Sequence, residues 1–306
     1  MATIESRLSQ IGYRVEDIDE EFYNILTTER PPPASLGFIV SKDDKLPVTV
    51  GPFELEVHQS KGLLNSKHEE GTTGAVVWRL SIPLAEFLLE NFSSSNAFLN
   101  SNSTVLELGS GSSGVMALTV GRKVKRWIAS DIDAIYRPLI RNLSENLGDE
   151  WSEKDGMFTQ TGGKKPKGKK KVNTSTSSPT ESSIEVVVIN WEQTDLRSNS
   201  VFRSGTGGVN MKIDMIVCTD CVYNIALIKP LIDTMVEASR LTHEAHGVYP
   251  LVLVAQEVRA DDVLEAFLTT FAELFEVWRI DRHLGGKWDR EVGGSAVLHA
   301  GFLKDN

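Results

Sequence analysis

Cysteine and long hydrophobic runs are scarce in this sequence of 306 residues, and both absences narrow the kind of protein it encodes. Two cysteines cannot supply a disulfide framework, so a reducing compartment is expected. No stretch approaches the ~20 uninterrupted apolar residues of a membrane-spanning helix. The segment Met1–Ser6 shows neither the features of a signal peptide nor those of a transit peptide. We therefore expect a cytoplasmic protein, with the nucleus as the alternative, and no membrane partner.

The two cysteines, Cys218 and Cys221, have a C-x-x-C spacing that is also found in zinc and redox sites. A structural zinc site needs four ligands, and no second Cys/His pair has a matching spacing; the nearest pair is His243 and His246. Cys218 lies in the apolar run 213–218, where a cysteine behaves as a small buried hydrophobe. We interpret the cysteines as packing residues and expect no metal site.

Basic residues are outnumbered and unevenly spread. The formal net charge is −10, and the chain outside residues 164–171 is still more acidic, which favours encounter with basic partners. That short segment holds six lysines and no acid: Lys164, Lys165, Lys167, Lys169, Lys170 and Lys171.

Residues 152–183, around these lysines, are rich in Lys, Gly, Ser and Thr and nearly free of aliphatic side chains. Such a segment cannot bury enough apolar surface to offset the entropy lost on ordering, so a disordered insertion is predicted. A solvated surface loop is the leading interpretation. Contact with RNA and nuclear targeting are the alternatives, although no binding of nucleic acid is required.

Residues 1–75 are predicted to form an accessory extension made of a helix and β-strands. Apolar residues from Ile18 to Leu26 recur at helical spacing, and Pro31–Pro33 cannot continue a helix. Two strand-like runs follow, at Leu36–Val40 and at Phe53–His58, with Gly51-Pro52 as a turn before the second.

Residues 76–306 alternate between strands and helices and are predicted to form a single α/β domain. The strands are apolar on both faces, which is typical of a parallel sheet covered by helices on each side. The last two strands have only a glycine-rich turn region between them, so they should form an antiparallel hairpin. Seven strands result: 104–108, 127–130, 184–189, 214–219, 251–255, 275–280 and 296–302. Helices are expected at 112–121, 134–147, about 225–241 and about 261–274, after a first one near 82–89.

A nucleotide-type cofactor is indicated by Gly109, Gly111 and Gly114. They match G-x-G-x-x-G between a predicted strand and a predicted helix, where the backbone approaches a ligand closely. Asp131 ends the next strand, 22 residues after Gly109, and its carboxylate could accept hydrogen bonds from ribose hydroxyls. Capping of the following helix is the alternative role of Asp131. These features suit a nicotinamide-dependent oxidoreductase as well as a methyltransferase.

Three features favour S-adenosylmethionine. Glu107, just before the glycine loop, suits the cationic amino end of that cofactor and would be poor beside a pyrophosphate. The closing antiparallel hairpin suits the seven-stranded, Rossmann-like sheet of methyltransferases. The segment Thr219–Tyr223 places an acid and a phenol at the carboxyl edge of the sheet, where doubly wound folds bind their ligands.

Several motifs resemble family 16 of the seven-β-strand lysine methyltransferases, and the fungal ribosomal-protein lysine methyltransferase 5 group most closely. The resemblance spans about residues 10–304, apart from the lysine-rich insertion. The general family motifs are Val105–Gly111, Asn190-Trp191 and Asp220–Asn224. Those shared with the fungal group are Val57–Ser60, Leu63-Leu64, Gly71–Trp78, Val254–Gln256 and Val297–Gly301.

The resemblance implies a class I methyltransferase fold, S-adenosylmethionine as methyl donor and a ribosomal protein as substrate. It implies cofactor contacts from Trp78, Gly109, Ser110, Gly111, Asp131, Trp191 and Thr219. Glu107 joins them for the electrostatic reason given above. For both tryptophans, packing in the core is the alternative. We expect a monomer.

The expected reaction is attack by a neutral lysine amine on the sulfonium methyl group. A lysine has a pKa of ~10.4, so it must first lose a proton, which burial and the sulfonium charge favour. The carboxylate of Asp220 favours the ammonium form, so we expect it to orient the amine; whether it also acts as a base stays open. Tyr223 would shape the lysine channel, with packing on the sheet as the alternative. Most of the rate should come from alignment.

Two other functions remain open from the sequence. One is the nicotinamide-dependent oxidoreductase, against which Glu107 argues. The other is a non-catalytic module that uses the fold to hold a ribosomal protein.

Overall fold

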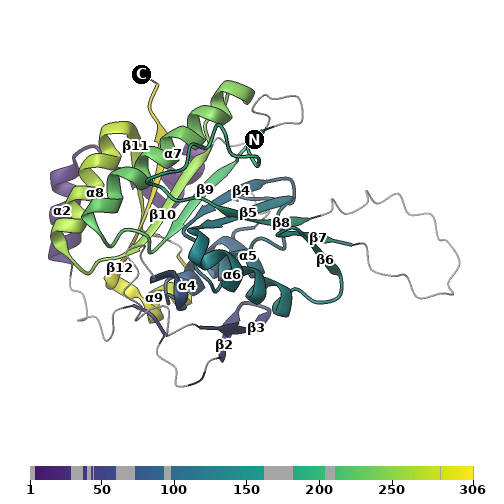
Figure 1. Cartoon of the computed structure of the whole chain (residues 1–306). Helices are drawn as coiled ribbons and strands as arrows, with labels where there is room; N and C mark the ends of the chain where they lie inside the picture. Colours follow the sequence, from purple (N-terminus) through teal and green to yellow (C-terminus); the bar gives the residue numbers. More distant parts are fainter. Residues whose placement is uncertain are drawn as a thin grey trace, which may run out of the picture.

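The computed structural model describes residues 4–28, 37–39, 43, 45–59, 73–92, 98–161, 182–203, 211–282 and 284–305. Within these ranges, one large mixed sheet carries helices on both faces, and a separate hairpin lies beside it (Figure 1). No helix there combines the length and the apolar character needed to cross a membrane.

The seven predicted strands form the centre of the sheet, which confirms the α/β prediction. In spatial order they are β11 (Phe275–Ile280), β12 (Ala296–Leu303), β10 (Leu251–Glu257), β9 (Met215–Thr219), β4 (Thr104–Leu108), β5 (Arg126–Asp131) and β8 (Ser183–Val188). The pairs from β10 to β8 are parallel, whereas β12 is antiparallel to both β10 and β11. The last strand therefore runs against the others, as expected.

Three short strands extend the sheet to ten. β1 (Gly12–Arg14) pairs with β11 at one edge. At the other edge, β7 (Met157–Gln160) pairs with β8, and β6 (Trp151–Lys154) pairs with β7. The expectation of disorder from residue 152 is therefore wrong for the start of that segment, because Trp151 and Phe158 bury their rings. The six lysines between 164 and 171 lie outside the described residues.

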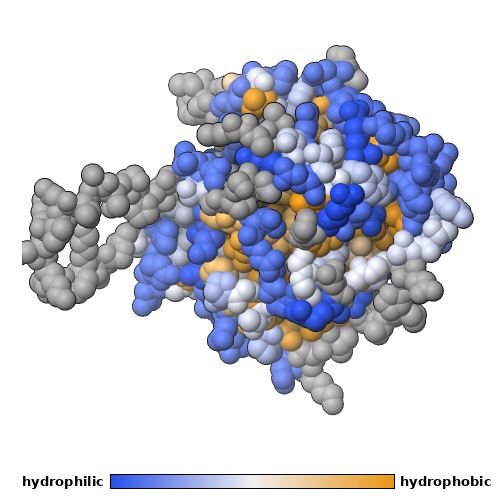
Figure 2. Space-filling view, turned by 180° about the vertical axis from the view of Figure 1, so that it is seen from behind, coloured by the Kyte–Doolittle hydropathy of each residue, from blue (hydrophilic) through white to orange (hydrophobic). Residues whose placement is uncertain are grey.

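Helices cover each face because successive strand residues point to opposite sides of the sheet. In β4, Val105 belongs to the core under one helical layer and Leu106 to the core under the other. The first layer contains α1 (Ile4–Ile11), α4 (Ser81–Glu90), α5 (Val115–Thr119) and α6 (Asp133–Asn146). The second contains α2 (Ile18–Thr27), α7 (Ile225–His246) and α8 (Asp261–Leu274). On the face seen in Figure 2, hydrophilic residues dominate the rim and apolar ones gather near the middle.

The N-terminal residues do not form one accessory unit, contrary to expectation. Residues 4–27 join the edge of the large sheet through β1, and α2 packs on α8. A separate two-stranded sheet of β2 (Lys45–Val50) and β3 (Phe53–His58) contacts α6 and α4 instead. Of the run Leu36–Val40, Phe38 forms a single bridge with Trp78. Both ends of that run and Pro31–Pro33 lie outside the described residues.

The connection between β11 and β12 also differs from the expected turn. It contains the helix α9 (Gly286–Glu291) and the short 3-10 helix η2 (Gly293–Ser295). Trp288 buries its indole against the core, which gives this short segment a reason to order. The two glycine pairs, which suggested a turn, lie at the starts of these two helices.

Candidate active site

A cavity of about 430 Å³ opens at the carboxyl edge of the parallel strands. Its walls come from the segments that follow β4, β5, β8 and β9, and from residues 73–81 beside the 3-10 helix η1 (Thr73–Ala75). All ten residues singled out in the sequence line it: Trp78, Glu107, Gly109, Ser110, Gly111, Asp131, Trp191, Thr219, Asp220 and Tyr223. The topology thus brings together side chains that lie far apart in the sequence.

The glycine loop after β4 forms the floor of the cavity. Gly109 has a φ of 75°, and its N–H donates to the carbonyl of Ser130 at 2.9 Å. A Cβ atom at position 109 would lie 2.5 Å from the buried sulfur of Cys221 and 3.3 Å from the ring of Trp191. Glycine is therefore required both for the left-handed backbone and for the close approach of its neighbours.

Glu107 lies at the end of β4, buried beneath the loop. Its Oε2 accepts a hydrogen bond from the indole N–H of Trp127 at 2.8 Å. Burial raises the pKa of Glu107 to about 7, although hydrogen bonds from Trp127 and Ser110 act in the opposite direction. A carboxyl group held in this way lacks a cationic partner among the described residues, which suits it to a cationic ligand group.

Asp131 connects the loop to the end of β5. Its Oδ2 accepts from the N–H of Gly111 and its Oδ1 from the N–H of Ile132, both at 2.8 Å. The cap position of α6 is occupied by Ile132, and no side chain caps that helix, so the capping alternative does not apply. Burial raises the pKa of Asp131 to about 6 against these two hydrogen bonds. Its contact with a ribose stays a prediction.

Trp191 and Thr219 each carry a polar side-chain atom that a ligand could pair with. Trp191 Nε1 and Thr219 Oγ1 are buried and have no hydrogen-bond partner within the described residues. Buried polar atoms without a partner cost free energy unless water or a ligand pairs with them, and both residues line the cavity. Trp78 differs, because its indole N–H donates to the carbonyl of Thr73 at 2.9 Å, which fixes the ring in the wall.

Asp220 follows β9 with a φ of 60°, a backbone conformation that is uncommon outside glycine. Arg259 grips its carboxylate with both terminal nitrogens, Nη1 to Oδ1 at 2.8 Å and Nη2 to Oδ2 at 2.5 Å. The N–H of Glu257 adds a third hydrogen bond to Oδ1 at 3.2 Å. Asp220 is therefore held by protein partners, and its side chain is fully buried behind the cavity wall.

Three charged residues that sequence reasoning missed complete this cluster. Arg259 Nη2 also donates to Glu257 Oε2 at 2.9 Å, and Arg79 donates to both oxygens of Glu257. The Arg259 guanidinium lies 5.1 Å from the ring centroid of Trp78, next to the cavity wall. Two arginines balance two buried acids. The sequence did carry one signal for them, because the opposite charges of Glu257 and Arg259 lie where β10 ends, at the same edge of the sheet.

Tyr223 lies at the mouth of the cavity with 37% of its surface exposed. Its hydroxyl oxygen accepts a hydrogen bond from Thr73 Oγ1 at 3.1 Å, which joins the segment after β9 to η1 across the opening. This exposure makes packing on the sheet a poor account of Tyr223. Thr73 itself was missed, although it lies in the Gly71–Trp78 motif.

The C-x-x-C pair lies beside the cavity and packs in the core. Both cysteines are free and buried, and Cys221 donates its thiol hydrogen to the carbonyl of Leu108 at 3.2 Å. Among the described side chains, no group of three His, Cys, Asp or Glu residues is arranged to hold a metal ion.

Comparison with known proteins gives a family match and several relatives. Residues 58–152 match the family model described as lysine methyltransferase, which takes in the glycine loop and Asp131. A Schizosaccharomyces pombe protein named diaminohydroxyphosphoribosylamino-pyrimidine deaminase is 26% identical over 267 residues, 86% of this chain and 53% of that protein.

Proteins named ribosomal lysine N-methyltransferase 5 are also similar. The one from Eremothecium gossypii is 29% identical over 164 residues, 54% of this chain and 47% of that protein. The one from Zygosaccharomyces rouxii is 27% identical over 233 residues, 71% of this chain and 70% of that protein. The chain therefore spans about half the length of the Schizosaccharomyces and Eremothecium relatives. The resemblance to lysine methyltransferases is therefore confirmed over residues 58–152, which include the glycine loop.

Proposed function

We propose that this protein is an S-adenosylmethionine-dependent protein-lysine N-methyltransferase that acts on a protein of the large ribosomal subunit. The observation that carries the proposal is one cavity that brings together a glycine loop, the carboxyl groups of Glu107 and Asp131, and the Asp220–Tyr223 segment. A pyrophosphate would meet the acid Glu107 at the loop, so this arrangement disfavours the nicotinamide-dependent alternative.

The residues present fit the proposed cofactor. Glu107 would attract its amino group and Asp131 its ribose hydroxyls, whereas the unpaired Thr219 Oγ1 and Trp191 Nε1 would find polar partners on it. Gly109 lets Cys221 and Trp191 pack closely against the loop, which keeps Trp191 in the cavity wall. When bound, S-adenosylmethionine supplies an electrophilic methyl group.

The charged cluster accounts for how a lysine could react beside a carboxylate. An isolated Asp220 would stabilise the ammonium form and hinder loss of the proton. Arg259 balances that charge at 2.5–2.8 Å, so an amine that reaches Asp220 would be oriented by it without its proton being held firmly. Tyr223 and Thr73 bound the opening through which a lysine side chain would enter.

The choice of substrate follows from the relatives and the charge. The similar proteins of Eremothecium and Zygosaccharomyces are named ribosomal lysine N-methyltransferases. An acidic chain, with a net charge of −10, would attract basic ribosomal proteins. We propose further that it acts as a monomer in the cytoplasm. The deaminase name of the Schizosaccharomyces relative belongs to a protein of which this chain matches 53%.

Incubation with tritiated S-adenosylmethionine and ribosomal proteins from a fungal lysate tests the proposal. We expect one labelled protein band, whose label disappears with the variant Asp131→Ala. The matched control is Asp133→Ala, two residues away and exposed, which should keep the label. A folded wild-type protein that labels no band would refute methylation; if that protein still captures a ribosomal protein, the non-catalytic module is the better account.

A further inference from the structure

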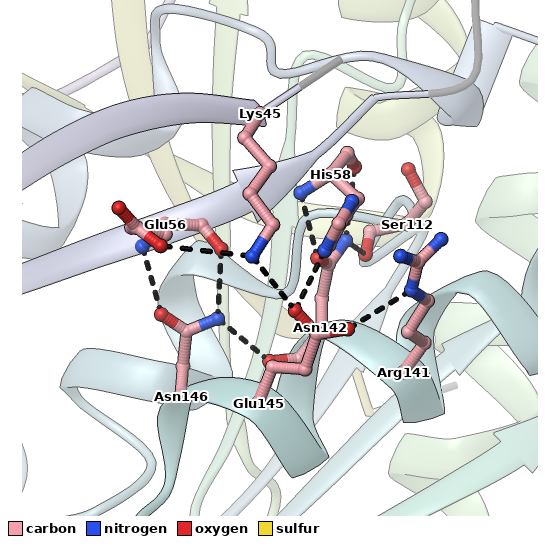
Figure 3. A network of polar contacts seen from close by, with 8 residues as sticks. All are labelled: Lys45, Glu56, His58, Ser112, Arg141, Asn142, Glu145 and Asn146. Carbon is pink, nitrogen blue, oxygen red and sulfur yellow. Dashed lines mark hydrogen bonds and ion pairs between the residues drawn. The ribbon is translucent and has the colours of Figure 1, made fainter.

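Helix α6 holds the β2–β3 hairpin with two asparagines one turn apart (Figure 3). Asn142 Oδ1 accepts from the N–H of His58 at 2.8 Å, and its Nδ2 donates to the carbonyl of His58 at 3.0 Å. Asn146 makes the same two bonds with Glu56: its Oδ1 accepts from the N–H at 2.8 Å, and its Nδ2 donates to the carbonyl at 3.0 Å. Residues 56 and 58 turn their backbone groups to the same side of β3, so the two side chains take the place of a neighbouring strand.

Asn142 has one further contact that Asn146 lacks. Its Nδ2 also donates to the carbonyl of Ser112, in the glycine loop, at 2.7 Å. The second hydrogen bond of Asn146 Nδ2 stays within α6, on the carbonyl of Asn142. One fully buried amide therefore connects the hairpin, the helix and the cofactor loop, whereas its neighbour connects the hairpin and the helix alone.

The loop depends on bonds from outside itself. Gly111 and Gly114 have positive φ values of 63° and 58°, and no regular secondary structure holds the segment between them. Three hydrogen bonds fix its backbone. The N–H of Gly111 donates to Asp131, and the N–H of Ser112 donates to the carbonyl of Gly74 at 2.6 Å. The side chain of Asn142 donates to the carbonyl of Ser112. Loss of Asn142 would leave the buried Ser112 carbonyl without this donor.

The ion pairs at the rim of the same contact are weaker candidates for this role. Glu145 pairs with His58 at 2.6 Å and with Lys45 at 3.3 Å, at positions partly open to solvent. Exposed pairs of this kind contribute little net stability. Among the polar contacts between the hairpin and α6, the two asparagines are therefore the main ones, beside the apolar packing of Leu55 and Val57 in the shared core.

We propose that Asn142 is a positioning residue that holds the glycine loop in its cofactor-accepting conformation and couples that conformation to the docked hairpin. The proposal rests on the S-adenosylmethionine site proposed above. Coupling between two sites is reciprocal. Release of the hairpin therefore weakens cofactor binding, and bound cofactor holds the hairpin more firmly on α6.

The variants Asn142→Ala and Asn146→Ala separate positioning from general stability. Each loses its pair of bonds to β3, so both lower the melting temperature and speed amide hydrogen exchange in β3. Asn142→Ala alone speeds exchange in residues 109–114 and raises the dissociation constant of S-adenosylmethionine about tenfold. Asn146→Ala leaves that constant within about twofold. Equal effects of the two variants on the loop and on the constant would overturn the proposal.

The wild-type chain provides a measurement that needs no variant, should Asn142→Ala fail to fold. Saturating S-adenosylmethionine should slow exchange of the His58 amide, and an unchanged rate with cofactor bound would also overturn the coupling. If the wild type binds no S-adenosylmethionine, the proposed function fails by itself. Amide hydrogen exchange in residues 109–114, measured without cofactor in Asn142→Ala and Asn146→Ala, still decides whether Asn142 positions the loop. The pair Asn142→Asp and Asn146→Asp can be compared in the same way.

Discussion

Two carboxyl groups of the cavity, the buried Glu107 and the partly buried Asp131, have no cationic partner among the described residues. Burial raises the pKa of Glu107 to about 7 and that of Asp131 to about 6. Both groups bind protons more tightly in the folded state than in the unfolded state. Their contribution therefore lowers the free energy of unfolding as the pH rises above their pKa values in the unfolded chain. A protein tolerates this cost where the acids serve a ligand, and a cationic, hydroxyl-bearing cofactor supplies partners for both.

The affinity for S-adenosylmethionine should accordingly depend on pH. As the pH falls from 7.5 to 5.5, Glu107 and then Asp131 take up protons and lose the charge that attracts the cofactor, so the dissociation constant should rise about tenfold or more. The variant Glu107→Gln should bind more weakly at pH 7.5 and show a flatter dependence. Calorimetric titrations at several pH values would measure this, and a wild-type constant that stays unchanged would contradict the assignment.

The pairing of Asp220 with Arg259 makes a second prediction at this scale. The variant Arg259→Lys keeps the positive charge but cannot bind both carboxylate oxygens, so Asp220 should lose its fixed orientation. We expect kcat to fall about tenfold, with the dissociation constant of the cofactor within about twofold.

A double-mutant cycle with Asp220→Asn is the control for that variant. The two substitutions should be strongly non-additive in kcat, because they remove the same pair. Additive losses would show that Arg259 acts on the reaction by a route other than Asp220.

Single residues were predicted best where their chemistry and their position after a strand agreed. Glu107, Asp131 and Thr219 lie at or next to the ends of parallel strands, and such ends meet at one edge of the sheet. Arg79 was missed because a lone arginine carries no local pattern, whereas Arg259 left only the signal of its opposite charge close to Glu257. Their roles arise from partners far along the chain, as in the pairing of Arg79 with Glu257.

At the scale of elements, a buried charged cluster fastens α2 to the far edge of the sheet. Glu21 of α2 accepts hydrogen bonds from Tyr13 at 2.7 Å and from Arg279 at 3.0 Å, and it pairs with His299 at 2.9 Å. Burial acts to raise the pKa of Glu21, but these partners outweigh it and lower the pKa to about 2. The ionised group therefore stabilises the fold above pH ~4.5, and that contribution is lost as the pH falls toward 2.

Replacing this acid should destabilise the protein most near neutral pH. For Glu21→Gln we expect a loss of about 3 kcal/mol in the free energy of unfolding at pH 7, because Arg279 and His299 lose their ionised partner. The difference from wild type should shrink between pH 5 and pH 3, where wild-type Glu21 gives up its own contribution. Urea unfolding followed by tryptophan fluorescence measures the free energy of unfolding at each pH, and the variant Glu20→Gln at an exposed position is the control. A difference independent of pH would contradict the assigned pKa.

Elements were predictable from sequence in proportion to their length. The long helices and the buried strands have enough residues to show a period, and α8 and β11 have the predicted bounds, Asp261–Leu274 and Phe275–Ile280. β1, β6 and β7 have three or four residues each, too few for an alternation to be seen. Their pairing depends on distant edges of the sheet, with which local sequence has no connection.

At the scale of the whole molecule, the sheet order follows from the sequence once the strands are known. Helical crossovers on both faces and a final antiparallel hairpin leave few arrangements open. The fate of residues 1–75 could not be foreseen, because nothing local shows that one part joins the large sheet through β1 while the β2–β3 hairpin docks on α6. Through Asn142, that hairpin reaches the glycine loop, so a segment that looked peripheral belongs to the surroundings of the cavity.

The measurement that tests the central claim most directly is a calorimetric titration of the full chain with S-adenosylmethionine at pH 7.5, beside an identical titration with NAD⁺. The account predicts saturable binding of S-adenosylmethionine at one site per chain, because Glu107 and Asp131 meet its cationic and hydroxyl groups. It predicts no saturable binding of NAD⁺, whose pyrophosphate would face the acid at the glycine loop. Saturable binding of NAD⁺, or a folded chain that binds neither, would contradict it.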